Sequence, residues 1–193
     1  MTDVRQLILS AIPAFTSTVL AVPDDAWDNP TPCEDWTVRD LVNHMTSEHL
    51  WAPRILHGET IEEVGSAYDG DVLGDDPTEA WRTAARASAE AWAYTDLGVK
   101  VHLSYGLIPA GDYAEQVLVD LAVHRWDLQR GANVGEAMDG AVVLHVLDYV
   151  RDQADSYGAS GLFDPPVPTE SEYAHDQLIA LAGRDPFWRS PAR

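Results

Sequence analysis

Residues 117–128 read VLVDLAVHRWDL, and apolar side chains occupy nearly every position of this run. A helix that is apolar on all sides lies inside a protein rather than on its surface. Asp120 and His124 are nevertheless one helical turn apart within it, so both side chains project from the same face. Asp127 follows on that side, three residues after His124. The run therefore predicts a buried central helix that carries polar chemistry into the core.

The flanking residues set the expected ends of this helix. Asp112 and Glu115 have the spacing of a capping box, which marks a helix start. Gly131 is the type of residue that commonly follows a helix end. These signals predict that the central helix spans about residues 113–130.

Apolar residues at helical spacing predict further helices on both sides of the central one. Thr37 and Asp40 form another expected capping box, and Asp76 precedes a proline at the first helical position. Together with the central helix, the predicted helices span about residues 3–21, 37–57, 76–92, 136–156 and 171–182.

The segments between these helices have a different composition. Residues 22–36 are rich in proline and aspartate, and residues 58–75 are acidic and glycine-rich, so both predict loops. Apolar and polar residues alternate near residues 98–104, which predicts a short strand or an extended connector rather than a sheet. The expected fold is an all-α, up-down helical bundle, with residues 1–193 in a single domain.

Charge and hydropathy exclude several classes of function. The chain has 32 acidic and 12 basic residues, a formal net charge of −20, so we expect no nucleic-acid partner. No apolar run approaches the roughly 18 to 20 residues of a membrane helix. The first 22 residues contain Asp3 and Pro13 and predict an amphipathic helix rather than a signal peptide. Cys33 is the only cysteine, and one cysteine forms no internal disulfide. A cytoplasmic protein acting on a small molecule is expected.

Two interpretations fit the polar pair in the central helix. An unpaired buried carboxylate costs several kcal/mol, so Asp120 and His124 must be compensated. They could satisfy each other or an arginine, or they could bind a divalent metal, which neutralises the carboxylate and takes a neutral imidazole. The spacing alone does not decide between these interpretations.

A metal would need a third ligand from another helix, and the second predicted helix offers His44. Its stripe also carries Leu41 and Ile55, and a single histidine on such a stripe is usually a core residue. Glu48, one turn later, either faces solvent or supports His44. Two histidines and a carboxylate form a common catalytic metal set with open positions, which zinc, nickel, iron or manganese would fit. Cys33 is expected to be a small buried residue rather than a nucleophile.

Three segments carry a family resemblance. Residues 31–44, TPCEDWTVRDLVNH, resemble the N-terminal signature of DinB-like metal-binding proteins. The branch is the one related to the mycothiol-dependent maleylpyruvate isomerase N-terminal domain. Residues 124–128, HRWDL, are similar to that branch's second signature. Residues 183–188, GRDPFW, resemble an ending common in its actinobacterial members.

The resemblance implies a four-helix bundle with a metal ion at one end. Its ligands would be His44 on the second helix and the Asp120 and His124 pair on a later one. The isomerase has glutamate where this chain has Asp120, which is one methylene shorter. Asp127 matches an acidic residue of the isomerase's active-site region and is the candidate catalytic residue. The family also allows a homodimer.

Three functions are compatible with this site. The resemblance implies a metal- and thiol-dependent transferase or isomerase, whose thiol would be mycothiol, bacillithiol or a similar small molecule, because Cys33 is the only protein thiol. The isomerase has a further C-terminal domain, so we do not expect its complete active site here. A metal-dependent hydrolase would use the same open position for water, with Asp127 or Glu48 as general base. A non-enzymatic metal- or ligand-binding bundle is the third.

Overall fold

The computed structural model describes residues 3–33, 35–135, 137–153 and 164–191. Within these residues there are seven helices and one two-stranded antiparallel sheet, which confirms the predicted all-α class. The elements are α1 (Val4–Leu20), α2 (Val38–Leu56), α3 (Ile61–Val64), α4 (Pro77–Tyr94), β1 (Lys100–Leu103), β2 (Gly106–Pro109), α5 (Ala110–Ala132), α6 (Gly140–Asp152) and α8 (Ala174–Leu181).

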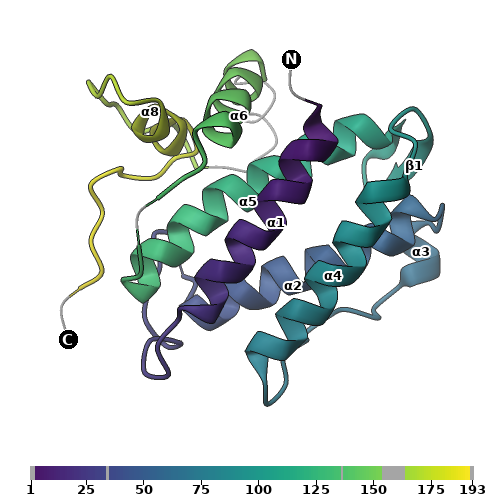
Figure 1. Cartoon of the computed structure of the whole chain (residues 1–193), viewed down its shortest axis with the longest axis horizontal. Helices are drawn as coiled ribbons and strands as arrows, with labels where there is room; N and C mark the ends of the chain where they lie inside the picture. The colour runs from purple at the N-terminus through teal and green to yellow at the C-terminus, as the bar shows by residue number, and fades with distance from the viewer. Residues whose placement is uncertain (1–2, 34, 136, 154–163, 192–193) are drawn as a thin grey trace.

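Four long helices form the bundle. In Figure 1, α1, α4, α2 and α5 form a ring in which each helix packs against the next, and α5 closes the ring against α1. Helix α6 packs on the outer side of α5, and α8 packs on α6. Within the described ranges, no helix combines the length and the hydropathy that a membrane span requires.

Large aromatic side chains fill the core between these helices. Trp81 of α4 packs against Phe15 of α1 with 4.6 Å between ring centroids, and both side chains are fully buried. Helix α5 is buried on nearly all sides, as its sequence predicts, and Leu118, Val123 and Leu128 have no exposed surface. The buried position of α5 is what brings its polar residues into the interior.

The ends of α5 differ from the prediction. The helix begins at Ala110, because strand β2 leads directly into it, and Pro109 at its N-cap makes no side-chain cap. The capping box expected from Asp112 and Glu115 is therefore wrong. The helix continues to Ala132 and ends on Asn133, whose backbone is left-handed with φ of 55°.

Gly131 has a packing role in place of the expected capping role. It lies inside α5, and a Cβ at this position would lie 2.9 Å from Thr31 Cγ2 and 3.1 Å from the carbonyl oxygen of Pro30. The loop before α2 thus approaches the backbone of α5 as closely as a glycine allows. Asn29 donates a hydrogen bond from its side-chain amide to the Gly131 carbonyl at 3.2 Å and holds the loop there.

Three other boundaries also need correction. The segment near residues 98–104 does form a sheet, because β1 pairs with β2 in the register Val101 to Ile108. Residues 58–75 are not all loop, since Thr60 caps the short helix α3. Helices α6 and α8 begin at Gly140 and Ala174, later than predicted, and the expected end of the former near residue 156 lies outside the described residues. The caps at Thr37 and Asp76 are confirmed.

Candidate metal centre

The three predicted ligands come together where α2 lies beside α5. His44 lies near the start of α2, and Asp120 and His124 lie on the facing side of α5. One donor atom from each side chain can be chosen so that all three lie within 4.8 Å of one another. His44 Nε2 is 3.9 Å from Asp120 Oδ2, and the two imidazole rings have centroids 5.2 Å apart, inclined at 74°.

These distances fit a divalent ion better than a direct hydrogen bond. A separation of 3.9 Å between His44 and Asp120 is too long for a hydrogen bond. The ligands of a tetrahedral zinc ion, bound at about 2.0 to 2.2 Å, lie roughly 3.4 Å from one another. His44 Nε2 and Asp120 Oδ2 would have to approach each other by roughly 0.5 Å to reach that spacing, and any other pair of these donors by at most about 1.4 Å. Two imidazoles and one carboxylate also match the donors that zinc prefers.

The candidate centre is open on one side and supplies a neutral imidazole. The side chains of His44 and Asp120 are 29% and 35% exposed, whereas that of His124 is buried. Burial lowers the pKa of His44 to about 4, the nearby Asp120 carboxylate opposes this shift, and His124 adds to it. His44 is therefore neutral at pH 7, which is the form that binds a metal.

Trp36 forms a wall beside both histidines. Its ring centroid is 4.8 Å from that of His44 and 5.7 Å from that of His124, and its plane lies within 28° of the latter ring. The loop fixes this position, because the Trp36 carbonyl accepts hydrogen bonds from the backbone N–H and the hydroxyl of Thr31, both at 3.0 Å. Sequence reasoning assigned no role to Trp36, although it directly precedes the cap of the helix that carries His44.

Asp127 lies behind His124, on the side away from the opening. Its side chain has no exposed surface, and its Oδ2 lies 3.0 Å from His124 Nδ1. A carboxylate only accepts hydrogen bonds, so Nδ1 is the protonated nitrogen in this contact and Nε2 is the one left to bind a metal. Histidines that bind metals commonly have such a carboxylate partner, which fixes the ring orientation. The catalytic role expected for Asp127 stays a prediction.

Arg184 completes this buried cluster from the C-terminal part of the chain. Its Nη2 lies 3.4 Å from Asp127 Oδ2 and 3.5 Å from Cys33 Sγ, and only 7% of the residue is exposed. Burial, with the Asp127 carboxylate as the next contribution, raises the pKa of the Cys33 thiol to about 11. Cys33 is thus a thiol at pH 7, as expected of a residue that is not a nucleophile.

A second group of potential ligands shares His124 with the first. Donor atoms of Cys33, His124 and Asp127 also lie within 4.8 Å of one another. This group is more buried than the first one, and the Arg184 guanidinium lies against two of its members.

The comparison with protein families agrees with this geometry. The family model described as "Mycothiol maleylpyruvate isomerase N-terminal domain" matches residues 9–129. The chain belongs to this DinB-like family. The matched span contains all three candidate ligands and Asp127, and it ends before Arg184.

The similar proteins found by sequence carry names that state no activity. Two uncharacterized proteins of Mycobacterium tuberculosis, from strains CDC 1551 and H37Rv, are each 26% identical to this chain over 180 residues. The alignment covers 89% of this chain and 92% of each relative. No solved structure matches the chain.

Glu48 is a further acidic residue on α2, the helix that carries His44. It is half-buried, one helical turn after His44. Burial raises its pKa to about 7, the Asp120 carboxylate raises it further, and His124 opposes the shift. Glu48 is therefore not a fully solvent-facing residue, and its role as a partner of His44 stays a prediction.

The remaining histidines of α2 and α6 have other partners. His49 is fully buried, and its Nδ1 lies 2.8 Å from the hydroxyl oxygen of Ser88 on α4. His145 on α6 lies 2.8 Å from a carboxylate oxygen of Glu115 on α5. Neither belongs to a group of potential metal ligands among the described residues.

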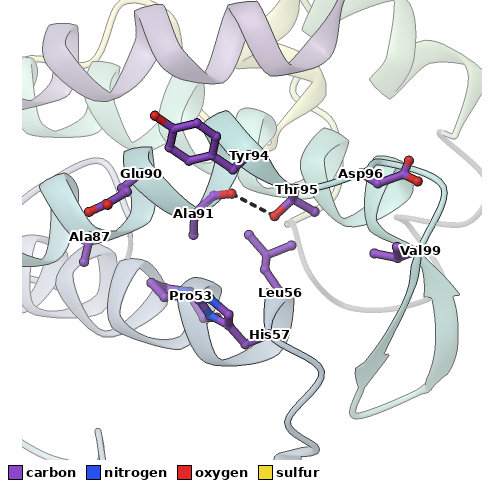
Figure 2. Close-up of a pocket in the computed structure, with 10 residues that line it drawn as sticks. All are labelled: Pro53, Leu56, His57, Ala87, Glu90, Ala91, Tyr94, Thr95, Asp96 and Val99. Carbon is purple, nitrogen blue, oxygen red and sulfur yellow. Dashed lines mark hydrogen bonds between the residues drawn. The ribbon is translucent and has the colours of Figure 1, made fainter.

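A separate pocket lies between the C-terminal ends of α2 and α4. It encloses about 510 Å³, and Leu56 and Tyr94 are among the residues that line it (Figure 2). The hydroxyl of Thr95 donates to the Ala91 carbonyl at 2.7 Å, so this polar group is bonded within its own helix end. None of the candidate metal ligands lines this pocket.

Proposed function

We propose that this protein binds one divalent metal ion of the zinc type through His44, Asp120 and His124. The observation that carries the proposal is the convergence of these donors from α2 and α5 within 4.8 Å, on a side of the bundle that is partly open. Three protein ligands that leave one position open are typical of catalytic rather than structural zinc sites.

The proposed reaction is a thiol-dependent transfer or isomerisation that uses mycothiol or a similar small thiol. The description of the matching family supports this choice of thiol. A divalent ion at this position would lower the pKa of a thiol and provide a thiolate at neutral pH. Cys33 is a poor source of that thiolate, because its pKa is about 11 and it lies against Arg184 rather than in the opening.

Each side chain around the centre has a distinct proposed role. His44 and Asp120 would bind the ion from the exposed side, and His124 would bind it through Nε2. Trp36 would form an apolar wall that keeps water from one side of the two imidazoles. Asp127 would act on the reaction only through His124, because its side chain has no exposed surface to meet a substrate. We therefore propose that it is a positioning residue.

A metal-dependent hydrolase is the second candidate, and Glu48 favours it. This carboxyl group is half-buried one helical turn after His44, and its pKa is raised to about 7, so it could accept a proton from a water molecule in the open position. Asp127 is less suited to this role, because its buried carboxylate faces His124 Nδ1 rather than the open position.

Metal content tests the binding proposal. Purified wild type, His44→Ala and His124→Ala would be compared by elemental analysis, with His102→Ala as the control because His102 is exposed on β1. We expect one equivalent of metal in wild type and in the control, and substantial loss in the other two variants. Unchanged metal content in both His44→Ala and His124→Ala would refute the proposed ligand set.

Calorimetry then separates the two reactions. We expect mycothiol to bind to the metal-loaded protein and not to the metal-free protein, and to be conjugated to an electrophile. Hydrolysis of ester or amide substrates without thiol binding would select the hydrolase instead. A loaded protein with neither activity would leave the non-enzymatic metal-binding bundle.

A further inference from the structure

His124 is shared by two groups of potential ligands, and a neutral imidazole can serve only one of them. One group contains His44 and Asp120, and the other contains Cys33 and Asp127. A neutral imidazole has one nitrogen with a proton and one with a lone pair. Whichever group receives the lone pair is the one that can bind a metal. Some feature of the fold must therefore decide which nitrogen of His124, Nδ1 or Nε2, carries the proton.

The Arg184 guanidinium is the charged group that distinguishes the two sides. Its Nη2 lies between Asp127 Oδ2, at 3.4 Å, and Cys33 Sγ, at 3.5 Å. A guanidinium is always protonated and carries a full positive charge. A divalent cation bound by Cys33 and Asp127 would have to displace this charge or lie beside it in a buried region, where repulsion is strong. Among the described residues, Asp120 forms its ion pair with His44 and with no arginine or lysine.

The same guanidinium compensates the carboxylate of Asp127. That side chain is fully buried, and a buried carboxylate without a cationic partner is strongly destabilised. With Arg184 beside it, the carboxylate is available to accept the proton on His124 Nδ1 at 3.0 Å. The interaction passes from Arg184 through Asp127 to His124, and it leaves Nε2 of His124 for the exposed side.

The turn after α8 holds Arg184 in this position. The Arg184 backbone N–H donates to the Ile179 carbonyl at 3.0 Å, and its Nη1 donates to the Ala182 carbonyl at 2.6 Å. Gly183 has a φ of +82°, and a Cβ there would lie 2.6 Å from the carbonyl oxygen of Asp164. The turn thus requires glycine at this position, and it directs the next side chain into the bundle. This segment lies beyond the family-matched residues 9–129.

We propose that Arg184 is a positioning residue of the metal centre, which directs the ion to the His44 and Asp120 side by holding Asp127 against His124 and by blocking the Cys33 side. This inference rests on the proposed metal binding. It adds a determinant of metal affinity that lies outside the ligand set and outside residues 9–129, the span that matches the family model.

The test measures Zn²⁺ affinity by competition with a chromophoric chelator. We expect Arg184→Gln and Asp127→Asn each to weaken Zn²⁺ binding by about 10- to 100-fold, the usual effect of removing a partner of a ligating histidine. Because Arg184 acts through Asp127, the two losses should not add. The Zn²⁺ affinity of the double variant should be no lower than that of whichever single variant has the lower affinity. Arg184→Lys keeps the positive charge and should recover most of the affinity. Arg82→Gln, at an exposed residue of α4, is the matched control.

The Co²⁺ absorption spectrum tests the Cys33 side independently. The Co²⁺-loaded wild type should lack a thiolate charge-transfer band, and Cys33→Ser should change neither this spectrum nor the Zn²⁺ affinity. A thiolate band in wild type that Cys33→Ser removes would overturn the inference. So would additive losses in the double variant, full affinity in Arg184→Gln, or no recovery in Arg184→Lys.

Folding and the basic proposal are controlled separately. Circular dichroism of each metal-free variant reports folding. If Arg184→Gln does not fold, the cycle is run with the uncharged Arg184→Met and Asp127→Asn, in which non-additive losses support the inference and additive losses overturn it. A wild type that binds no Zn²⁺ would overturn the proposed function itself. A wild type that binds Zn²⁺ tightly, with Arg184→Gln equal to it, would overturn only the role of Arg184.

Discussion

His124 and Asp127, three residues apart on α5, are joined by a 3.0 Å contact between Nδ1 and Oδ2. The two side chains differ in depth: Asp127 is fully buried, while His124 lies closer to the open side. The contact leaves Nε2 of His124 as the nitrogen that could bind a metal, so Asp127 would help to define the proposed centre without being one of its ligands. The consequences of this arrangement can be tested residue by residue.

We expect metal binding to require a carboxylate at position 120 but not the exact side-chain length of aspartate. Asp120→Ala removes both a donor and a negative charge, so Zn²⁺ affinity should fall by at least about 100-fold, more than for the loss of a ligand's partner. Asp120→Glu restores the residue that the resemblance implies for the isomerase and should retain binding within about 10-fold. The measurement is chelator competition, with Asp148→Ala as the control because that side chain is 80% exposed. Equal affinity in Asp120→Ala and wild type would remove Asp120 from the ligand set.

Gly131 predicts a stability effect opposite to the usual one. Alanine normally stabilises a helix relative to glycine by up to about 1 kcal/mol. In Gly131→Ala the new Cβ would meet Thr31 Cγ2 at 2.9 Å and a backbone oxygen at 3.1 Å, which neither atom can easily avoid. We expect a loss of about 1 to 3 kcal/mol in the free energy of unfolding, as for an overpacked core.

Gly140 provides the matched control for this measurement. It is the first residue of α6, and a Cβ there would have no neighbour within 4 Å. Chemical denaturation should therefore show Gly140→Ala unchanged or slightly more stable than wild type. If Gly131→Ala were as stable as Gly140→Ala, the close approach of the loop to α5 would be wrong.

The central helix and one face of the site could be predicted from sequence because both depend on local spacing. Eight of the twelve positions from residue 117 to 128 are apolar, and a separation of four residues puts Asp120 and His124 on one face. His44 required the family resemblance, since nothing in the local pattern distinguishes a ligand from a core histidine. In the structure its Nε2 faces Asp120 across 3.9 Å.

Other features could not be predicted because they depend on distant parts of the chain. Strand β1 needs β2 as its partner, and residues 106–109, GLIP, show no alternation that would mark them as a strand. Gly131 fits equally well as a helix cap and as a point of close approach, and only the position of Thr31 decides. Arginine is usually a surface residue, so the sequence does not mark Arg184 as buried. Only the turn after α8 brings it to Asp127.

His49 predicts a measurable dependence of stability on pH. Burial lowers its pKa from 6.5 to about 3, with His44 adding to the shift, so the folded protein keeps it neutral while the unfolded chain protonates it. Between pH 6.5 and about 3 the unfolded state binds one more proton, and the free energy of unfolding falls by about 1.4 kcal/mol for each pH unit lost. Above pH 6.5 both states are neutral at His49, and its contribution is constant.

The variant His49→Gln isolates this contribution in metal-free protein. Glutamine can still hydrogen-bond to Ser88 but does not titrate, so between pH 6 and 4 the stability of wild type should fall about 3 kcal/mol further than that of the variant. His102→Gln replaces an exposed histidine and should keep the wild-type slope. Parallel curves for wild type and His49→Gln would show that His49 is protonated in the folded state as well.

Metal removal should lower thermal stability in wild type and leave ligand variants unaffected. An ion bound by α2 and α5 binds only the folded chain, and at a free concentration 100 times its Kd it stabilises the fold by about 2.7 kcal/mol. Adding a chelator to Zn²⁺-loaded wild type should therefore lower Tm by several degrees, as monitored by calorimetry. His44→Ala should show the same low Tm with and without the chelator, because its affinity is lost before the chelator is added. A chelator effect of equal size in His44→Ala would place the stabilising ion elsewhere in the protein.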